Sequence, residues 1–165
     1  MFILKIITVV VMASVILAAI ALMILVRTAS KPGHLGLKGG KFAPCPTSPN
    51  CVSSQSKDRA KYIEPISYEH SADAARTRLL AILGNRKNGT VIEAQDRYVH
   101  VEFRSRLFAF VDDAEFYLDE EAKVLHLRSA SRVGYSDLGA NRRRLEEIRS
   151  AFLETVAASP VSESR

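Results

Sequence analysis

The sequence is poor in cysteine, with only Cys45 and Cys51 among its 165 residues. Two thiols with five residues between them, no second pair and no histidine nearby match no common zinc-binding pattern. We therefore predict neither a metal site nor a cofactor. A lipid-modified cysteine at the N-terminus is disfavoured as well, because Cys45 lies far beyond the apolar run near the start of the chain.

The two cysteines lie in a segment that is stiffened by three prolines. A disulfide between Cys45 and Cys51 would hold together a segment that has little other means of order. For so small a loop, the chain-entropy model gives about 2 kcal/mol. Such a bond would exclude thiol catalysis. Without it, Cys51 with Ser53 and Ser54 would need a histidine brought near by the fold, because no local signature of a cysteine enzyme is present.

The domain also lacks a surplus of positive charge. The chain has 23 Lys and Arg against 18 Asp and Glu, a net charge of +5. Five of these cations flank the first apolar run, and without them the two signs balance; they are Lys5, Arg27, Lys31, Lys38 and Lys41. A domain that binds nucleic acid carries its basic surplus on a folded face. The charge distribution therefore argues against nucleic acid as a partner.

Charged residues are absent from residues 6–26, which are mainly apolar. A helix rises about 1.5 Å per residue, so a helix of this length crosses the hydrocarbon core of a bilayer. We predict a transmembrane helix over residues 5–26 that anchors the protein. The alternative is a cleaved signal peptide with Ala19–Ala21 at its cleavage site. Its apolar region is usually only about 7–15 residues long, and here the apolar run continues to Val26.

The orientation of this anchor depends on two opposing signals. The four cations that follow the helix outweigh Lys5, which favours a cytoplasmic domain with its basic segment against anionic lipid. The predicted disulfide favours an oxidising compartment. We favour the second interpretation, a periplasmic domain anchored in the bacterial inner membrane. The basic, Gly-rich residues 27–41 would then form a flexible tether, in which nothing holds His34 in place.

The rest of the chain predicts a single domain over residues 42–158, followed by a disordered tail over residues 159–165. Lys61–Ile66 is expected to form a strand, with Pro65 at its end or on a sheet edge. Ser71 is a good helix N-cap, and apolar residues at helical spacing continue to Gly84. We therefore predict a helix between these two residues.

Beyond this helix the apolar residues recur at every second position, which is typical of half-buried antiparallel strands. Four strands are predicted: one beginning at Val91, then Val99–Phe103, Phe110–Leu118 and Val124–Ala130. A closing helix is predicted from about Asn141 to Ala157. The fold class is therefore α+β, with an antiparallel sheet of about five strands and two helices on one face, preceded by the N-terminal transmembrane helix.

Two stretches of the domain carry a family resemblance. The first is Pro44–Ser54, and the second comprises Phe103–Phe116 and Arg128–Arg142. Together they resemble the family of bacterial and plastid proteins called domain of unknown function 1499. The resemblance covers nearly the whole domain, and it implies no particular activity because the family is itself uncharacterised. One departure is Ala109, which stands where a glycine is expected in a Leu-Phe-Gly-Phe motif.

The alternation also places a group of polar side chains on one face of the predicted sheet. Its members are His100, Glu102, Arg104, Glu115, Tyr117, His126 and Arg128. If the helices cover the apolar face, this polar face is open to solvent. It is then either a surface of cross-strand ion pairs, which contribute little to stability, or a functional site.

A segment rich in arginine and serine forms a second candidate site. Cations open the last predicted helix, where the helix dipole favours an anion instead. A bound phosphate, sulfate or carboxylate would explain this placement. The predicted ligand-binding residues are Arg104, Arg128, Ser129, Ser131, Arg132, Asn141 and Arg142. The alternative is internal pairing, including i,i+4 pairs within the helix. The carboxylates available for this internal pairing are Asp112, Asp113 and Asp137. Within the helix, Glu146 and Glu147 lie four residues after Arg142 and Arg143.

The adjacent carboxylates Asp112 and Asp113 could serve acid–base catalysis, but neighbouring strand residues point to opposite faces. The candidate catalytic residues are His100, His126, Asp112 and Asp113, in a membrane-bound hydrolase. We favour a non-catalytic accessory or binding domain instead. Its partner would be an anionic small ligand, a lipid head group or another protein.

Overall fold

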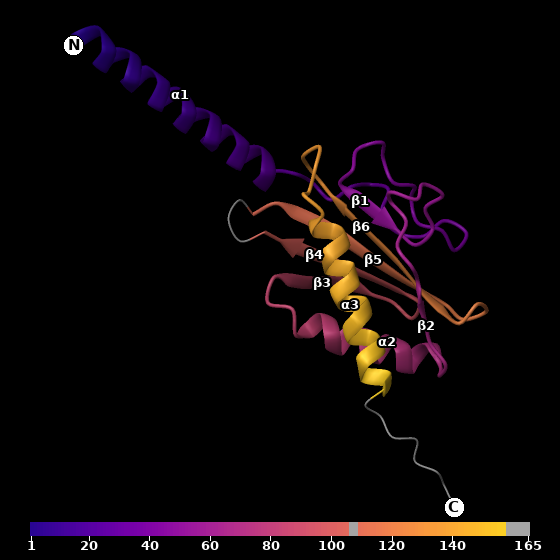
Figure 1. The fold of residues 1–165 in the computed structure, drawn as a ribbon. Coiled ribbons are helices and arrows are strands. Elements are labelled where there is room, and N and C mark those ends of the chain that lie inside the picture. Colours follow the sequence, from indigo (N-terminus) through magenta and orange to yellow (C-terminus); the bar gives the residue numbers. More distant parts are fainter. Residues whose placement is uncertain (106–108, 158–165) are drawn as a thin grey trace, which may run out of the picture.

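The computed structural model describes residues 1–105 and 109–157 (Figure 1). Within them the elements are α1 (Phe2–Arg27), β1 (Cys51–Ser53), β2 (Ile66–Ser67), α2 (Ala72–Gly84), β3 (Gly89–Ala94), β4 (Tyr98–Arg104), β5 (Val111–Asp119), β6 (Val124–Ser131) and α3 (Ala140–Ala157). The predicted α+β class is confirmed. The last residue of the predicted domain, residue 158, and the predicted tail over 159–165 lie outside the described residues.

All strand pairs in the sheet are antiparallel, in the order β1–β6–β5–β4–β3, and β2 also pairs with β6. The sheet has one strand more than predicted, because β1 is only three residues long and too short to show an alternating pattern. The predicted strand Lys61–Ile66 is displaced in the structure. β2 begins at Ile66, directly after Pro65, since proline lacks the N–H group that a strand ladder uses.

Helices α2 and α3 cover one face of the sheet, in front of the strands in Figure 1. Ser71 caps α2 as predicted, because its hydroxyl accepts a hydrogen bond from the backbone N–H of Ala74 at 3.2 Å. Every second side chain of β4, β5 and β6 points toward the helices, and the apolar ones among them are buried there. Burying each of these large apolar side chains stabilises the fold by about 1.5–3 kcal/mol. The core includes Leu79, Val99, Val101, Phe103, Phe116, Leu125, Leu127, Leu145, Ile148 and Phe152.

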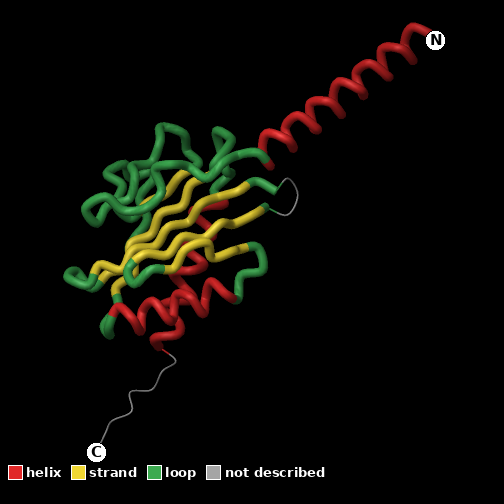
Figure 2. The backbone as a smooth tube through the Cα atoms, turned by 180° about the vertical axis from the view of Figure 1, so that it is seen from behind, coloured by secondary structure: helices red, strands yellow, loops and turns green. Residues whose placement is uncertain are grey.

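Residues 28–50, which we call the strap, contact the opposite face of the sheet. Figure 2 views this face, with loops lying across its upper part. The backbone N–H of Gly36 donates to the Glu115 carboxylate at 2.8 Å, and Nε of Arg128 donates to the carbonyl of Ala43 at 2.9 Å. The prediction of an open polar face is therefore wrong. Main-chain groups of the strap cover that face by pairing with its charged side chains.

The strap is fastened at its far end as well. The predicted disulfide between Cys45 and Cys51 is present and joins the strap to the first residue of β1. Gln55 adds a second link: its Oε1 accepts from the N–H of Phe42, and its Nε2 donates to the carbonyl of Gly40, both at 2.9 Å. The predicted flexible tether thus makes defined contacts with the domain.

The predicted N-terminal apolar helix is confirmed as α1, which extends away from the domain (Figure 1). The stretch Phe2–Val26 has a mean hydropathy of 3.1 and is long and apolar enough to cross a membrane. A signal sequence near the N-terminus meets the same criterion of length and composition. At the end of the helix, Val26 is only 1% exposed, whereas the large apolar residues before it are exposed.

Candidate functional site

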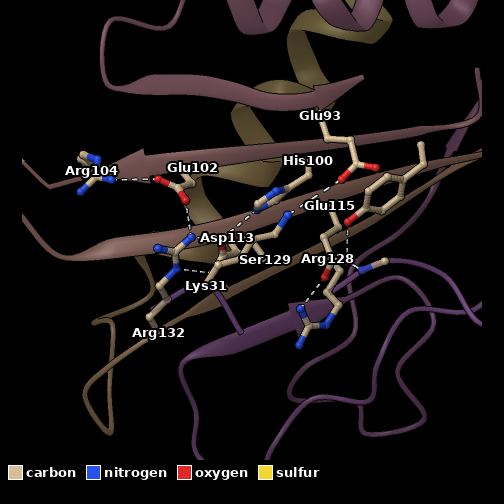
Figure 3. A network of polar contacts seen from close by, with 12 residues as sticks. Lys31, Glu93, His100, Glu102, Arg104, Asp113, Glu115, Arg128, Ser129 and Arg132 are labelled. Atoms are coloured by element: carbon tan, nitrogen blue, oxygen red, sulfur yellow. Dashed lines mark hydrogen bonds and ion pairs between the residues drawn. The ribbon is translucent and has the colours of Figure 1, made fainter. Parts of the chain in front are cut away.

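Charged side chains on the strap-covered face form a buried network across the sheet (Figure 3). Nε2 of His100, on β4, lies 2.8 Å from Oδ1 of Asp113, on β5. Arg132, which follows β6, donates to both oxygens of Asp113 at 2.8 and 2.7 Å and also pairs with Glu102. Glu102 in turn accepts from Arg104 at 2.9 Å. Arg104 is the exposed end of the chain of contacts, with 55% of its side chain accessible.

Glu115 and Arg128 form the second part of the network, opposite each other in the β5–β6 register. Nη1 of Arg128 donates to Glu115 at 2.6 Å, and both side chains are at most 1% exposed. The other oxygen of Glu115 accepts from the Tyr98 hydroxyl at 2.9 Å and from the N–H of Gly36. Burial, reinforced by the Glu115 carboxylate, raises the pKa of Tyr98. Its hydroxyl therefore stays protonated and donates.

The formal charges of the network balance. Its members are Glu102, Asp113 and Glu115 with Arg104, Arg128 and Arg132. Burial alone would raise the pKa of Asp113, but hydrogen bonds from Arg132 and His100 outweigh it and lower that pKa. The hydrogen bond to Asp113 likewise raises the pKa of Arg132. Buried charges are tolerated when they are paired, so this network has the character of an internal structural layer.

His100 has the geometry of a catalytic histidine but not the access. Because the ionised Asp113 carboxylate only accepts hydrogen bonds, Nε2 of His100 donates to it. Its Nδ1 is buried and has no hydrogen-bond partner among residues 1–105 and 109–157. None of the His100 side chain is exposed. The ring therefore presents no surface to a substrate, which a general base has to reach.

Asp112 points to the helix-covered face, as the alternation of strand residues predicts. It accepts from the Ser131 hydroxyl at 2.5 Å and from Arg144 of α3 at 2.6 Å. Asp113 bonds to His100 and Arg132 on the other face. The two carboxylates are thus separated by the sheet and do not form a catalytic pair.

Three residues that were predicted to bind an anion bond to one another beneath α3. The Ser129 hydroxyl lies 2.5 Å from Oδ1 of Asn141, and the Asn141 amide donates to the Ser131 hydroxyl at 3.1 Å. The same amide also donates to the carbonyl of Asn50, at the end of the strap. Asn141 is completely buried. These polar groups therefore join α3, β6 and the strap.

The cations at the start of α3 also have protein partners. Arg142 donates to two carbonyls in the loop before β2, both at 2.8 Å. The predicted i,i+4 pairs are wrong. Glu147 pairs with Arg86 at 2.5 Å and Glu146 with Arg149 at 3.5 Å. The guanidinium of Arg142 donates to the carbonyls of Tyr62 and Ala60 instead of pairing with Glu146.

A pocket of about 990 Å³ lies between the strap and the turn that connects β5 to β6. Its wall on the strap side runs from Gly39 to Thr47, and its floor includes residues that follow β1. Of the predicted catalytic residues, His126 lines this pocket. The polar side chains around it include Ser54, Gln55, Lys57 and Tyr117.

Ser54 and His126 meet in this pocket although they are 72 residues apart in the chain. The Ser54 hydroxyl lies 3.1 Å from Nδ1 of His126 and accepts from the backbone N–H of Leu127 at 2.9 Å. With its proton directed to Nδ1, the hydroxyl pairs with the histidine tautomer that carries its ring proton on Nε2; in the other tautomer Nδ1 donates to the second lone pair of the hydroxyl. Burial lowers the pKa of His126, against an opposing effect of Asp119. The ring stacks on Tyr117, with 6.1 Å between the ring centres.

Sequence reasoning considered Ser54 only as a neighbour of Cys51, and the disulfide excludes thiol chemistry there. It did not single out Gln55 or the pairing of Ser54 with His126. The available signal was the run of polar residues directly after the second cysteine. In the described ranges no group of three or more His, Cys, Asp or Glu side chains is placed to hold a metal ion.

The DUF1499 family, described as a protein of unknown function, matches residues 41–152, more than half of the chain. The chain belongs to this family. No curated protein and no solved structure matches it. The DUF1499 match begins in the strap, includes all six strands and ends in α3, so the side chains of the buried network lie inside it. Helix α1 precedes the match.

The family resemblance noted in the two sequence stretches is thus confirmed, and the structure shows why a glycine is expected at position 109. Ala109 has a φ angle of 56°, in the left-handed region that favours glycine. A glycine in the Leu-Phe-Gly-Phe motif would adopt this conformation without strain. The DUF1499 chain described here adopts it with an alanine, at a cost of about 1 kcal/mol.

Proposed function

We propose that this DUF1499 protein is a membrane-anchored binding domain that takes a small polar ligand into the pocket beside the strap. The observation that carries the proposal is the Ser54–His126 pair inside that pocket. Pockets with a few convergent polar groups and a histidine of shifted pKa are the usual places for ligands. With the Ser54 proton directed to Nδ1, Nε2 of His126 supplies a hydrogen-bond donor to the ligand.

The charges around the pocket favour a ligand with little net charge. Cations and carboxylates are equally numerous in its lining: Lys41, Lys57, Lys61 and Arg97 with Asp58, Asp119, Glu120 and Glu121. Arg97 already pairs with Glu120 at 2.5 Å. A neutral sugar or a zwitterion therefore fits this lining better than the anion first expected at Arg128 and Arg132, which pair inside the protein.

The buried network supports this function indirectly, because it holds the strap that forms one wall of the pocket. Gly36 and Ala43 of the strap are bonded to Glu115 and Arg128. Gly40, between them, approaches Tyr117, and a Cβ atom placed there would lie 3.4 Å from the tyrosine hydroxyl. The network thus positions the strap, and the residues that line the pocket contact the ligand.

Helix α1 supplies the anchor in this proposal, as an uncleaved transmembrane helix. The Cys45–Cys51 disulfide supports an extracytoplasmic domain, periplasmic in a bacterium, because disulfides persist in oxidising compartments. In intact cells, a membrane-impermeant maleimide is expected to label the cysteines only after treatment with an impermeant reductant. Labelling that requires lysis of the cells would place the domain in the cytoplasm, and a mature chain lacking α1 would exclude the anchor.

The pocket is tested by thermal-shift screening of the full chain in detergent against neutral sugars and zwitterions such as phosphocholine and betaine. We expect a compound that raises the melting temperature of the wild type and has no effect on Ser54→Ala or His126→Phe. Ser150→Ala, at an exposed position of α3, is the matched control and keeps the shift. Shifts that persist in both pocket variants would contradict the proposal.

A second candidate function, hydrolysis, is favoured by the same 3.1 Å contact, since a serine paired with a histidine is the core of many nucleophilic sites. The N–H of Leu127 opposes it by occupying a lone pair of the Ser54 hydroxyl. A reactive fluorophosphonate probe distinguishes the two functions. Labelling of Ser54 that disappears in His126→Phe would establish the hydrolase, and no labelling is expected for a binding pocket.

A further inference from the structure

Two large apolar side chains stand in solvent on the loop between β6 and α3. Tyr135 is 77% exposed and Leu138 is 84% exposed. Apart from Met1 and the residues of α1, the other exposed large apolar side chains of the described residues are Val91, Ile92 and Leu153, and none of these three exceeds 44%. The tip of this loop is therefore the most exposed apolar part of the described domain.

The loop is braced in a conformation that keeps its tip outward. The Asp137 carboxylate accepts from the backbone N–H of Gly139 at 3.0 Å and of Asn141 at 2.8 Å. Arg143 donates to the carbonyl of Leu138 at 2.7 Å. Leu138 itself has a φ of 51°, which is unfavourable for a leucine. The hydrogen bonds hold the backbone in this conformation, and the Leu138 side chain that it carries stays exposed.

The loop lies at the end of the sheet where the chain arrives from α1. Pro32 and His34, shortly after α1, line a pocket of about 530 Å³ together with Val133 and Gly134 at the start of the loop. Figure 1 shows α1 joining the domain at the end of the sheet from which the β6–α3 connection projects. If α1 spans a bilayer, this end of the domain is the one nearest to the membrane surface.

We infer that Tyr135 and Leu138 insert into the interfacial region of the bilayer that α1 crosses, an inference that rests on the anchor role proposed for α1. Tyrosine is enriched at the level of the lipid head groups, and apolar side chains bind at the boundary with the acyl chains. Arg143 is exposed beside Leu138 and adds a cation that attracts anionic head groups. The loop gives the domain a second membrane contact beside α1, which restricts the orientation of the domain relative to the bilayer.

The chain contains no tryptophan, so a single introduced tryptophan reports on its surroundings. The full-length Leu138→Trp variant is reconstituted into vesicles of phosphatidylcholine and phosphatidylglycerol in equal parts, with either ordinary or brominated acyl chains. We expect blue-shifted emission that the brominated lipid quenches. The matched control is Leu153→Trp, near the other end of α3, where the emission stays at the wavelength of a hydrated tryptophan and is not quenched.

Flotation of the same vesicles separates this inference from the proposed anchor. If the Leu138→Trp chain floats with the vesicles but its emission matches that of Leu153→Trp, the anchor stands and the inserted loop is wrong. That result is also the one expected if a partner protein covers the loop instead of lipid. A chain that does not float with the vesicles overturns the anchor and the inserted loop together.

Discussion

The two faces of the sheet are both buried, but by different means. On the helix-covered face, Phe116 of β5 packs among apolar side chains of α2 and α3. On the strap-covered face its neighbour Glu115 accepts hydrogen bonds from Tyr98, Arg128 and the strap. One face is held by non-directional burial of apolar surface, and the other by paired charges whose geometry depends on the strap.

This difference shows that an alternating strand pattern does not mean that one face meets water. The polar face here is sealed by a segment rich in glycine and proline, which supplies backbone groups instead of apolar side chains. A cover of this kind is only as stable as the hydrogen bonds beneath it. The two faces should therefore respond differently to the same kinds of change.

The largest expected effects come from Glu115→Ala and Phe116→Ala, adjacent substitutions on opposite faces. Loss of Glu115 leaves the Arg128 charge buried without its partner and should destabilise the protein by about 3–5 kcal/mol. Phe116→Ala removes a buried ring and should have a similar effect, about 3–5 kcal/mol. Urea unfolding of the full chain in detergent measures both. A loss below about 1 kcal/mol for Glu115→Ala, the size for an exposed pair, would contradict the buried network.

The two faces should respond differently when a second substitution is added. Replacing Glu115 and Arg128 together by methionine removes both buried charges and should recover most of the stability that Glu115→Ala loses. On the apolar face no second substitution of this kind restores stability, because Phe116→Ala leaves a cavity rather than an unpaired charge. If the double variant were as unstable as the single one, pairing of charges would not be what holds the strap-covered face.

Removal of the disulfide is the next largest change. Cys45→Ser with Cys51→Ser should destabilise the protein by about 2 kcal/mol, the value expected for so short a loop. We expect hydrogen exchange to increase in the strap and to stay unchanged in α2, which packs on the other face. Equal increases in both regions would mean that the two faces are not independent.

The helix-covered face was predictable because its signal lies in side chains. Val99, Val101 and Phe103 recur at every second position, and burial follows from that period. The cover of the other face was not predictable, because it depends on the N–H of Gly36 and the carbonyl of Ala43. Every residue carries such groups, so no pattern of residue types marks the ones that make these contacts.

Acid should weaken the strap-covered face before the other. The pKa of Asp113 lies below its ordinary value of 3.8 in the folded protein, so its stabilising contribution is complete above that value. The contribution is lost as the pH falls below 3.8 toward the folded-state pKa. The free energy of unfolding of Asp113→Asn should therefore depend less on pH than that of the wild type between about pH 4 and 2, the range of this titration. Acid unfolding followed by circular dichroism measures it. An unchanged acid dependence would exclude Asp113 as its source.

The smallest expected effect is a gain in stability, from a substitution that lies on neither face. Ala109 lies in the connection between β4 and β5 with a φ of 56°. Ala109→Gly removes this strain and should stabilise the protein by about 1 kcal/mol, offset in part by the greater freedom of glycine in the unfolded chain. Thermal unfolding of the full chain measures it, with Ala122→Gly as a control at an exposed turn. A lower melting temperature for Ala109→Gly would contradict the strain.

The candidate site was less predictable than the fold. The split of Asp112 and Asp113 between faces followed from strand alternation and is confirmed. The Ser54–His126 contact depends on how the chain after β1 lies beside β6, which links residues 72 positions apart. Patterns over a few neighbouring residues do not predict which distant segments lie side by side. The arginines indicated an anion site because their partners, too, come from distant strands and loops.

The central claim, that the strap is a fixed cover and not a loose tether, is tested most directly at the amide of Gly36. Its N–H donates to the buried Glu115 carboxylate, so its hydrogen exchange should be slowed by orders of magnitude relative to an unstructured peptide. Glu115→Gln should accelerate that exchange while leaving the amides of α2 protected. Exchange of Gly36 in the wild type at the rate of a free peptide would show that residues 28–50 do not cover the sheet.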